Sequence, residues 1–73
     1  MEETIQEKIE RWFTYHAPTP DQVVKYAVIR DAAKAFALVI AANTPLSAYQ
    51  TASIRHLRDC VMTANCSIAC GGR

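Results

Sequence analysis

One uninterrupted apolar segment constrains the fold of this chain more than any other feature. From Ala35 to Ala42 the sequence reads AFALVIAA, and it ends a longer helical pattern whose charged residues all lie earlier. A helix that is apolar all round has to be covered on nearly every side. A chain of 73 residues has little of its own to cover it with. We therefore expect further copies of the same chain to supply the missing cover.

The composition predicts one small domain, residues 1–73, that gains its stability by association. Hydrophobic residues make up 51% of the chain, with only two Gly and three Pro, which excludes disorder and low complexity. The cysteines are three in number, and the N-terminus is charged. Both features favour a reducing cytoplasm over a disulfide framework or a secretory leader. No apolar run reaches the roughly 20 residues that cross a bilayer, so self-association remains as the added source of stability.

Capping signals divide the chain into three helices and predict an all-α fold. A short helix over 1–15 carries the stripe Ile5, Ile9, Trp12 and Phe13, and Glu2 and Glu3 suit its positive end. Two prolines then break the pattern. A long helix over 20–43 begins with Thr19 as N-cap, Pro20 in the first turn and Gln22 in a capping box.

The third helix, predicted over 47–70, follows a short connection and completes an antiparallel hairpin. Ser47 and Gln50 repeat the capping-box spacing, and the pair Gly71–Gly72 stops the helix. Its seam steps by three and four residues, as in coiled coils. The seam residues expected on this helix are Ile54, Leu57, Val61, Ala64 and Ile68. Those expected on the preceding helix are Tyr26, Ile29, Ala33, Phe36 and Ile40.

Catalysis, metal binding and binding of polymeric nucleic acid find no support in the sequence. Cys66 and Cys70 lie one turn apart, as do His56 and Cys60, but each pair supplies only half of a zinc site. No Gly-rich phosphate loop, nucleophile elbow or carboxylate pair is present. The net charge of +1 comes without a basic stripe. We expect a protein without enzymatic activity, cofactor, metal, membrane segment or DNA and RNA partner.

Six residues are candidates for contact with a small anionic ligand, each with an ordinary structural alternative. Tyr15, beside His16, either closes the core or stacks on a base. Arg30 is either a solvated charge or a planar phosphate clamp, and Lys34 lies one turn further on. Arg55 and Arg58 are three residues apart and either hold a second anion or are solvated. Asn65 either sets the register between helices, which we favour, or contacts the ligand. The six candidates are Tyr15, His16, Arg30, Lys34, Arg55 and Asn65.

Three segments together resemble a known family. They are HAPTPDQ leading into KYAVIRDAAKAFA, the connection NTPLS, and LRDCVMTANCSIAC. They are similar to the helical-hairpin domain of the phage anti-CBASS cyclic-nucleotide sponges and the related anti-Thoeris sponges, over roughly residues 15 to 70. The anti-Thoeris branch usually has a strand-rich region ahead of the hairpin, so the anti-CBASS branch fits better.

The resemblance implies a function and two site residues. Sponges of the anti-CBASS branch are helical homo-oligomers, typically hexamers, that bind cyclic dinucleotides or cyclic trinucleotides between protomers and starve a host effector. The resemblance matches Tyr15 to an aromatic residue that stacks on a base, and Arg30 to a basic residue that meets a phosphate. Thr63 and Cys66 depart from the family pattern, which bears on the identity of the ligand. The alternatives are a helical protein-interaction or regulatory subunit, and a sponge for cyclic ADP-ribose type signals.

Overall fold

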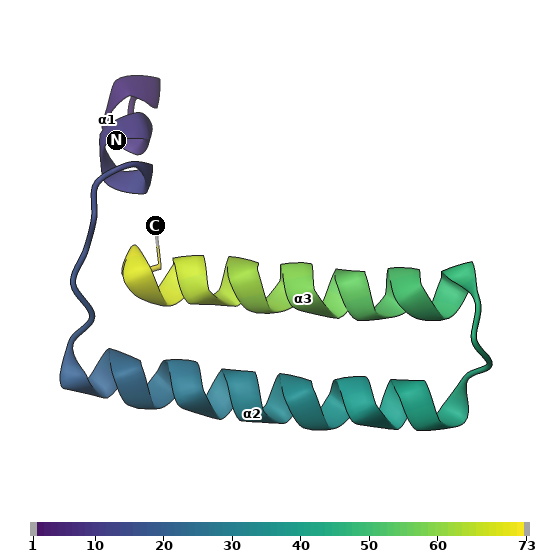
Figure 1. Cartoon of the computed structure of the whole chain (residues 1–73). Coiled ribbons are helices and arrows are strands. Elements are labelled where there is room, and N and C mark those ends of the chain that lie inside the picture. The colour runs from purple at the N-terminus through teal and green to yellow at the C-terminus, as the bar shows by residue number, and fades with distance from the viewer. Residues whose placement is uncertain (1, 73) are drawn as a thin grey trace.

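The computed structural model describes residues 2–72 and consists of three helices in this range. They are α1 (Ile5–Trp12), α2 (Pro20–Asn43) and α3 (Ala48–Ala69). Helices α2 and α3 lie side by side and antiparallel, whereas α1 stands apart over the C-terminal end of α3, on the side away from α2 (Figure 1). The all-α fold and the helical hairpin expected from the sequence are confirmed.

Helix α2 has the bounds that its capping signals predict. The Thr19 hydroxyl accepts a hydrogen bond from the Gln22 N–H at 3.2 Å, and the Gln22 side chain accepts one from the Thr19 N–H at 3.0 Å. Pro20 occupies the first turn, where its missing N–H costs nothing. Helix α3 lies within its predicted range, with Ser47 as its N-cap and Cys70 as its C-cap.

Helix α1 is shorter than the sequence predicted and begins after a cap that the sequence analysis did not name. Thr4 and Glu7 form a capping box, so the helix begins at Ile5. It ends at Trp12 because side chains take its last carbonyls: the Thr14 hydroxyl donates to the Glu10 carbonyl, and the His16 ring lies 3.0 Å from the Arg11 carbonyl. Glu3 does not act at the start of the helix as expected, since it forms an ion pair with Arg11 near the other end.

The loop between α2 and α3 is held by one side-chain amide. Ser47 accepts a hydrogen bond from the Gln50 N–H at 3.1 Å, but the Gln50 side chain does not return to Ser47 as a capping box requires. It donates instead to the carbonyl and hydroxyl oxygens of Thr44, each at 3.1 Å. Gln50 therefore ties the start of α3 to the end of α2, where the sequence predicted only a local cap.

The hairpin seam follows the predicted pattern with one correction. All five seam residues expected on α3 are half-buried, and so are Tyr26, Ile29, Ala33 and Ile40 on α2. Phe36 was expected among them but remains 56% exposed, and the neighbouring Ala37 lies in the seam. Successive side chains along a helix point about 100° apart. The result places the two alanines Ala33 and Ala37 opposite α3, where small side chains permit close approach.

The molecule exposes far more surface than a compact protein of its mass. Its accessible surface is 6146 Å² for 8.1 kDa, whereas a compact monomer of this mass exposes about 4,500 Å². Its radius of gyration is 15.7 Å, against about 11 Å for a compact chain of the same length. No side chain in residues 2–72 is fully buried. A single chain thus has a seam but no enclosed core.

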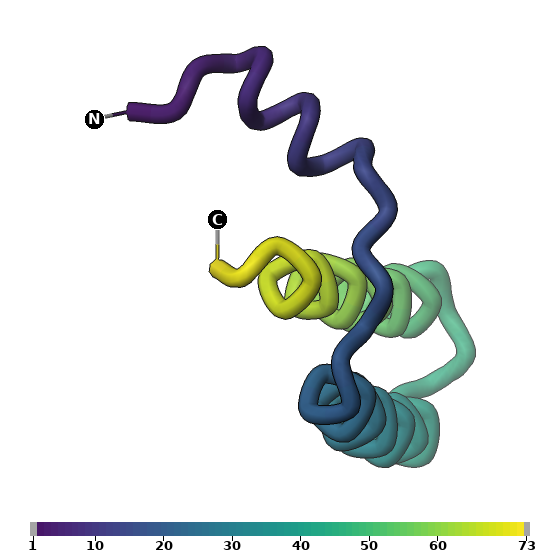
Figure 2. The backbone as a smooth tube through the Cα atoms, turned by 90° about the vertical axis from the view of Figure 1, so that its left-hand side faces the viewer, coloured from purple at the N-terminus to yellow at the C-terminus, as the bar shows by residue number. Residues whose placement is uncertain are grey.

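Helix α1 overhangs the C-terminal end of α3 rather than packing along the hairpin (Figure 2). Trp12 borders a small cavity of about 240 Å³ together with the α3 residues Thr63, Cys66, Ser67 and the C-cap Cys70. The hydrogen bond with Glu3 raises the pKa of Arg11 above its ordinary value, and the Cys70 thiol nearby acts in the same direction. Helix α1 is therefore placed by a few contacts at one end of α3.

Candidate functional site

A groove between α2 and α3 gathers three cations over an apolar floor. Arg30 and Lys34 border it from α2, and Arg58 borders it from α3. The floor consists of Ala33, Ala37, Ile54, Leu57 and Val61. Guanidinium groups bind phosphate oxygens in a planar, bidentate manner, and an apolar floor suits the face of a base or a sugar. The groove therefore matches the chemistry of a small phosphorylated ligand.

The groove in one chain is too small and too open to enclose such a ligand. Its volume is about 230 Å³, whereas sites that bury most of a small molecule measure about 300–1,000 Å³. Arg30 is also available for binding. Its side chain is 71% exposed, and its one ion pair joins its Nε to the Asp31 carboxylate at 4.0 Å, a surface pair of the kind that contributes at most about 1 kcal/mol.

Two of the six predicted site residues border the groove, and Arg58 borders it where Arg55 was expected. Arg30 and Lys34 share the groove, as adjacent turns of one helix must. Arg55, which we named, is exposed and does not border the groove, whereas Arg58 does. The sequence had placed both arginines on one face of α3. Each arginine directly follows a residue of the hairpin seam, Ile54 or Leu57, so the sequence holds no signal that separates them.

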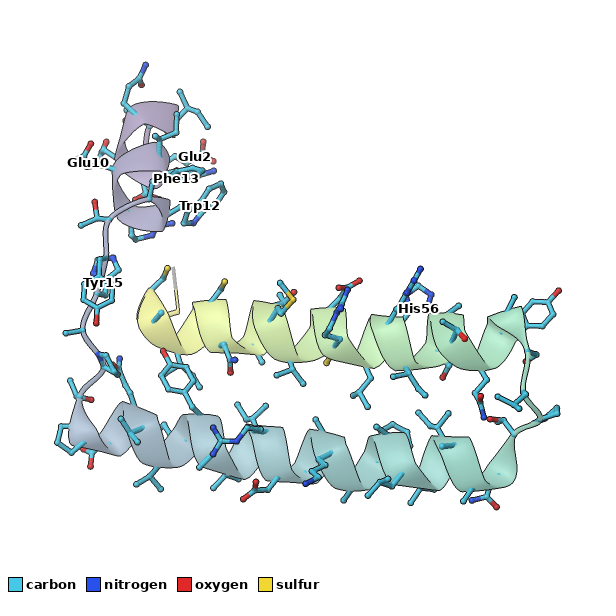
Figure 3. The ribbon with its side chains drawn as sticks, viewed as in Figure 1. Glu2, Glu10, Trp12, Phe13, Tyr15 and His56 are labelled. Carbon is cyan, nitrogen blue, oxygen red and sulfur yellow. The ribbon has the colours of Figure 1, made fainter. Side chains whose placement is uncertain are left out.

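Tyr15 lies outside the groove of its own chain. It projects from the linker between α1 and α2, beyond the end of the hairpin (Figure 3), and is 84% exposed. Arg30 lies ten residues into α2, about 15 Å along the helix axis from Pro20. Within one protomer, then, the proposed stacking residue and the proposed phosphate-binding residue are not neighbours.

His16 lies in acidic surroundings that do not suit an anion. It borders a cavity of about 420 Å³ together with Arg11, Thr14 and three glutamates, Glu3, Glu7 and Glu10. Its Nε2 is 3.0 Å from the Arg11 carbonyl oxygen. Three carboxylates against one guanidinium repel a phosphate. His16 therefore has a structural role at the end of α1 in this protomer.

Asn65 is half-buried in the seam, and its side-chain oxygen is orphaned. In the part of the chain that the structure describes, Asn65 Oδ1 is enclosed but has no hydrogen-bond donor. A buried carbonyl oxygen left without a donor costs about 1–3 kcal/mol. Gln22, in the first turn of α2, donates its side-chain amide to the Ile68 carbonyl at 3.1 Å and not to Asn65. Asn65 thus retains an unused acceptor.

The described residues show neither a cluster of metal-binding side chains nor a membrane-spanning helix. Residues 2–72 contain no group of three or more His, Cys, Asp and Glu side chains placed to hold a metal ion. The three cysteines form no disulfide with one another. Within the same range, no helix combines the length and the apolar character that a membrane span requires.

The hairpin with its basic groove is a small helical binding module, and comparison with protein families gives its class. A family model described as "Acb2/Tad1, hairpin domain" matches residues 6–69. The chain therefore belongs to the Acb2/Tad1 hairpin-domain family, the anti-CBASS and anti-Thoeris sponge family. Proteins of this family are sponge-type binding proteins rather than enzymes, and membership implies binding of cyclic nucleotide signals. No curated protein and no solved structure matches the chain.

Proposed function

We propose that this protein binds and sequesters cyclic oligonucleotide second messengers, namely cyclic dinucleotides and cyclic trinucleotides, and so keeps host CBASS effectors inactive. It is a phage immune-evasion protein without enzymatic activity that acts in the cytoplasm of the host cell. The observation that carries the proposal is the groove in which Arg30, Lys34 and Arg58 surround an apolar floor, in a chain of the sponge family.

The site proposed here is completed by a second copy of the chain. One groove offers cations but no exposed aromatic face, and Tyr15 of the same chain lies away from it. A symmetric assembly, a hexamer by the resemblance noted above, brings Tyr15 of one protomer to the groove of another. A twofold interface then supplies two aromatic rings and two sets of cations. That arrangement suits a cyclic dinucleotide, which has two bases and two phosphates.

Sequestration needs tight binding but no chemistry. The ligand also stabilises the assembly that binds it, because it binds the assembled state and not the separated chains. Tyr15 stacks on a base, and Arg30 and Lys34 meet phosphate oxygens. Arg58 joins this set, and Arg55 and His16 have the weakest support. Asn65, whose side-chain oxygen is enclosed in the seam, sets the register between the helices.

A thermal-shift panel tests the proposal. The protein is heated with cyclic dinucleotides, cyclic trinucleotides and cyclic ADP-ribose isomers, with linear dinucleotides as the matched control. We expect the melting temperature to rise by several degrees with a cyclic oligonucleotide. A rise with cyclic ADP-ribose isomers alone identifies a sponge for that signal instead. A melting temperature that no nucleotide changes contradicts the proposal and favours a helical protein-interaction subunit. The exposed apolar side chains of α1 and α2 are consistent with that alternative.

A further inference from the structure

One face of α2 is apolar over most of its length and is left uncovered by the other residues in the range 2–72. Its positions follow each other by steps of four, three, four, three and four residues, the spacing of a coiled-coil seam. We call this the outer α2 face, and its residues are Val24, Val28, Asp31, Ala35, Leu38 and Ala42. Five of the six are apolar. Val24 and Val28 are each 63% exposed and Leu38 is 62% exposed.

The outer α2 face points away from α3. Residues of the hairpin seam, such as Ile29 and Ala33, lie about 120–180° around the helix from it, by the 100° turn per residue. The corresponding outer side of α3 is different, because it carries polar residues such as His56, which projects away from α2 (Figure 3). Others on that side are Arg55, Asp59, Thr63 and Ser67. The hairpin is therefore apolar on the outside along α2 and mainly polar on the outside along α3, where the exposed Met62 and Cys66 interrupt the polar residues.

We propose that the outer α2 face pairs with the same face of a second copy, with the two helices antiparallel. This inference rests on the proposed function only in that both require self-association. The surface in excess of a compact monomer, 6146 Å² against about 4,500 Å², exceeds the roughly 800 Å² that each partner buries in a standard interface. A face that is apolar at both ends and symmetric in spacing is complementary to itself, as a twofold contact requires.

The spacing of the face fixes the register. Its six positions are symmetric about a point near Ala33, so an antiparallel partner places Val24 opposite Ala42 and Val28 opposite Leu38 of the second copy. The central layer then joins Asp31 to Ala35. The layers of Val24 and Asp31 each pair a larger side chain with an alanine, and the remaining layer pairs Val28 with Leu38. Such combinations fill the space between two helices without voids. The small residues Ala35 and Ala42 let the helices approach closely.

The single charge on the face selects the antiparallel arrangement. In a parallel pair each Asp31 meets Asp31 of the other copy, and two carboxylates taken from water repel each other. In the antiparallel pair Asp31 lies opposite Ala35, next to Lys34 of the second copy. Two aspartates and two lysines then alternate in sign around the twofold axis. A single polar position of this kind is a known means of setting helix register.

Cysteine cross-linking tests both the contact and its direction. In a background with Cys60, Cys66 and Cys70 changed to serine, one chain carries Val28→Cys and a second, with a size tag, carries Leu38→Cys. The chains are mixed without nucleotide, allowed to exchange subunits and oxidised. We expect a disulfide-linked heterodimer in the mixture at several times the yield of homodimer from either variant alone. Circular dichroism of each variant confirms that it is helical.

A matched control and the ligand assay make the result decisive. Tyr49→Cys, at a position 89% exposed on α3, measures cross-linking by collision. Homodimers of Val28→Cys and of Leu38→Cys that equal the heterodimer indicate a parallel pair and overturn the proposal, as does a mixture no better than Tyr49→Cys. Nucleotide binding by the unmodified protein is measured separately. A thermal shift without the heterodimer rejects this interface alone, and the heterodimer without a thermal shift rejects the sponge function alone.

Discussion

The side-chain amide of Gln22 donates a hydrogen bond to the Ile68 carbonyl oxygen at 3.1 Å, and so joins the first turn of α2 to the last turn of α3. The two residues are separated by almost the whole hairpin in sequence. The same side chain accepts from the Thr19 N–H at 3.0 Å. One residue thus caps α2 and closes the end of the hairpin that faces α1.

We predict that Gln22→Glu destabilises the hairpin although it keeps the cap. A carboxylate still accepts from the Thr19 N–H, but it cannot donate to Ile68 and faces that carbonyl with like polarity. The expected loss is about 0.5–1.5 kcal/mol in the free energy of unfolding, the net contribution of one such hydrogen bond. Urea unfolding at fixed protein concentration measures it. Gln22→Glu with an unchanged midpoint means that the bond to Ile68 contributes nothing.

Helix α1 is predicted to lose stability in acid through its capping box. Hydrogen bonds from the Thr4 backbone and side chain lower the pKa of Glu7 below its ordinary value of 4.5. A lowered carboxyl pKa means that the capped state is favoured fully above pH 4.5 and loses this contribution as the pH falls through the lower, folded-state value. NMR titration of the Glu7 side chain measures the shift. In Thr4→Ala the Glu7 pKa should return toward 4.5; a titration identical in both proteins refutes the assignment.

Arg58 and Arg55 form a matched pair for the groove. Arg58 borders it beside Arg30 and Lys34, whereas Arg55 is exposed outside it. Loss of a charge-assisted hydrogen bond costs about 1.5–3 kcal/mol, so Arg58→Ala should weaken cyclic dinucleotide binding by about 10- to 150-fold. Arg55→Ala should change the affinity less than about threefold. Calorimetric titration distinguishes them, and a larger effect of Arg55→Ala shows that the ligand lies elsewhere.

Tyr15 is predicted to act through its ring. Stacking on a base contributes about 1–3 kcal/mol, so Tyr15→Ala should weaken nucleotide binding by about 5- to 150-fold, while Tyr15→Phe keeps most of the affinity. Both variants should keep the oligomeric state, because in the proposed site the Tyr15 ring, 84% exposed in the single chain, meets the ligand and not the neighbouring chain. Sedimentation of both variants provides the control. Dissociation of Tyr15→Ala into monomers assigns the ring to the interface between chains.

The proposed contact between Asp31 of one copy and Lys34 of a second copy gives a prediction that needs no cysteine cross-linking. Asp31→Lys alone and Lys34→Asp alone should each weaken self-association by about tenfold, since like charges meet at the twofold axis. A mixture of the two variants restores opposite charges across the contact and should associate as well as the unmodified protein. Mixing experiments in the ultracentrifuge measure this. A mixture as weak as its components places the two residues in separate surroundings.

The sequence predicted the elements better than the faces, and particular residues show why. The bounds of α2 follow from local chemistry at Thr19, Pro20 and Gln22, which a neighbouring helix does not alter. Phe36 was misplaced because α2 is apolar on two sides, so its periodicity alone cannot select the side that meets α3. Only the packing, which brings Ala37 into the seam, decides it.

The candidate site was predictable in part for a related reason. Arg30 and Lys34 share a side of one helix, and their spacing alone places them together. The choice of Arg58 over Arg55 depends on how α3 is rotated against α2, which the spacing of three residues does not determine. In the proposed assembly the position of Tyr15 relative to the groove depends on a second chain, and the spacing of residues in one sequence does not determine how two chains meet.

Sedimentation velocity at micromolar concentration, with and without a cyclic dinucleotide, tests the central claim most directly. The claim is that copies of this chain cover one another's apolar faces and thereby complete the nucleotide site. We predict a species several times the chain mass of 8.1 kDa, present without ligand and further stabilised by it. A single 8.1 kDa species under both conditions contradicts the account.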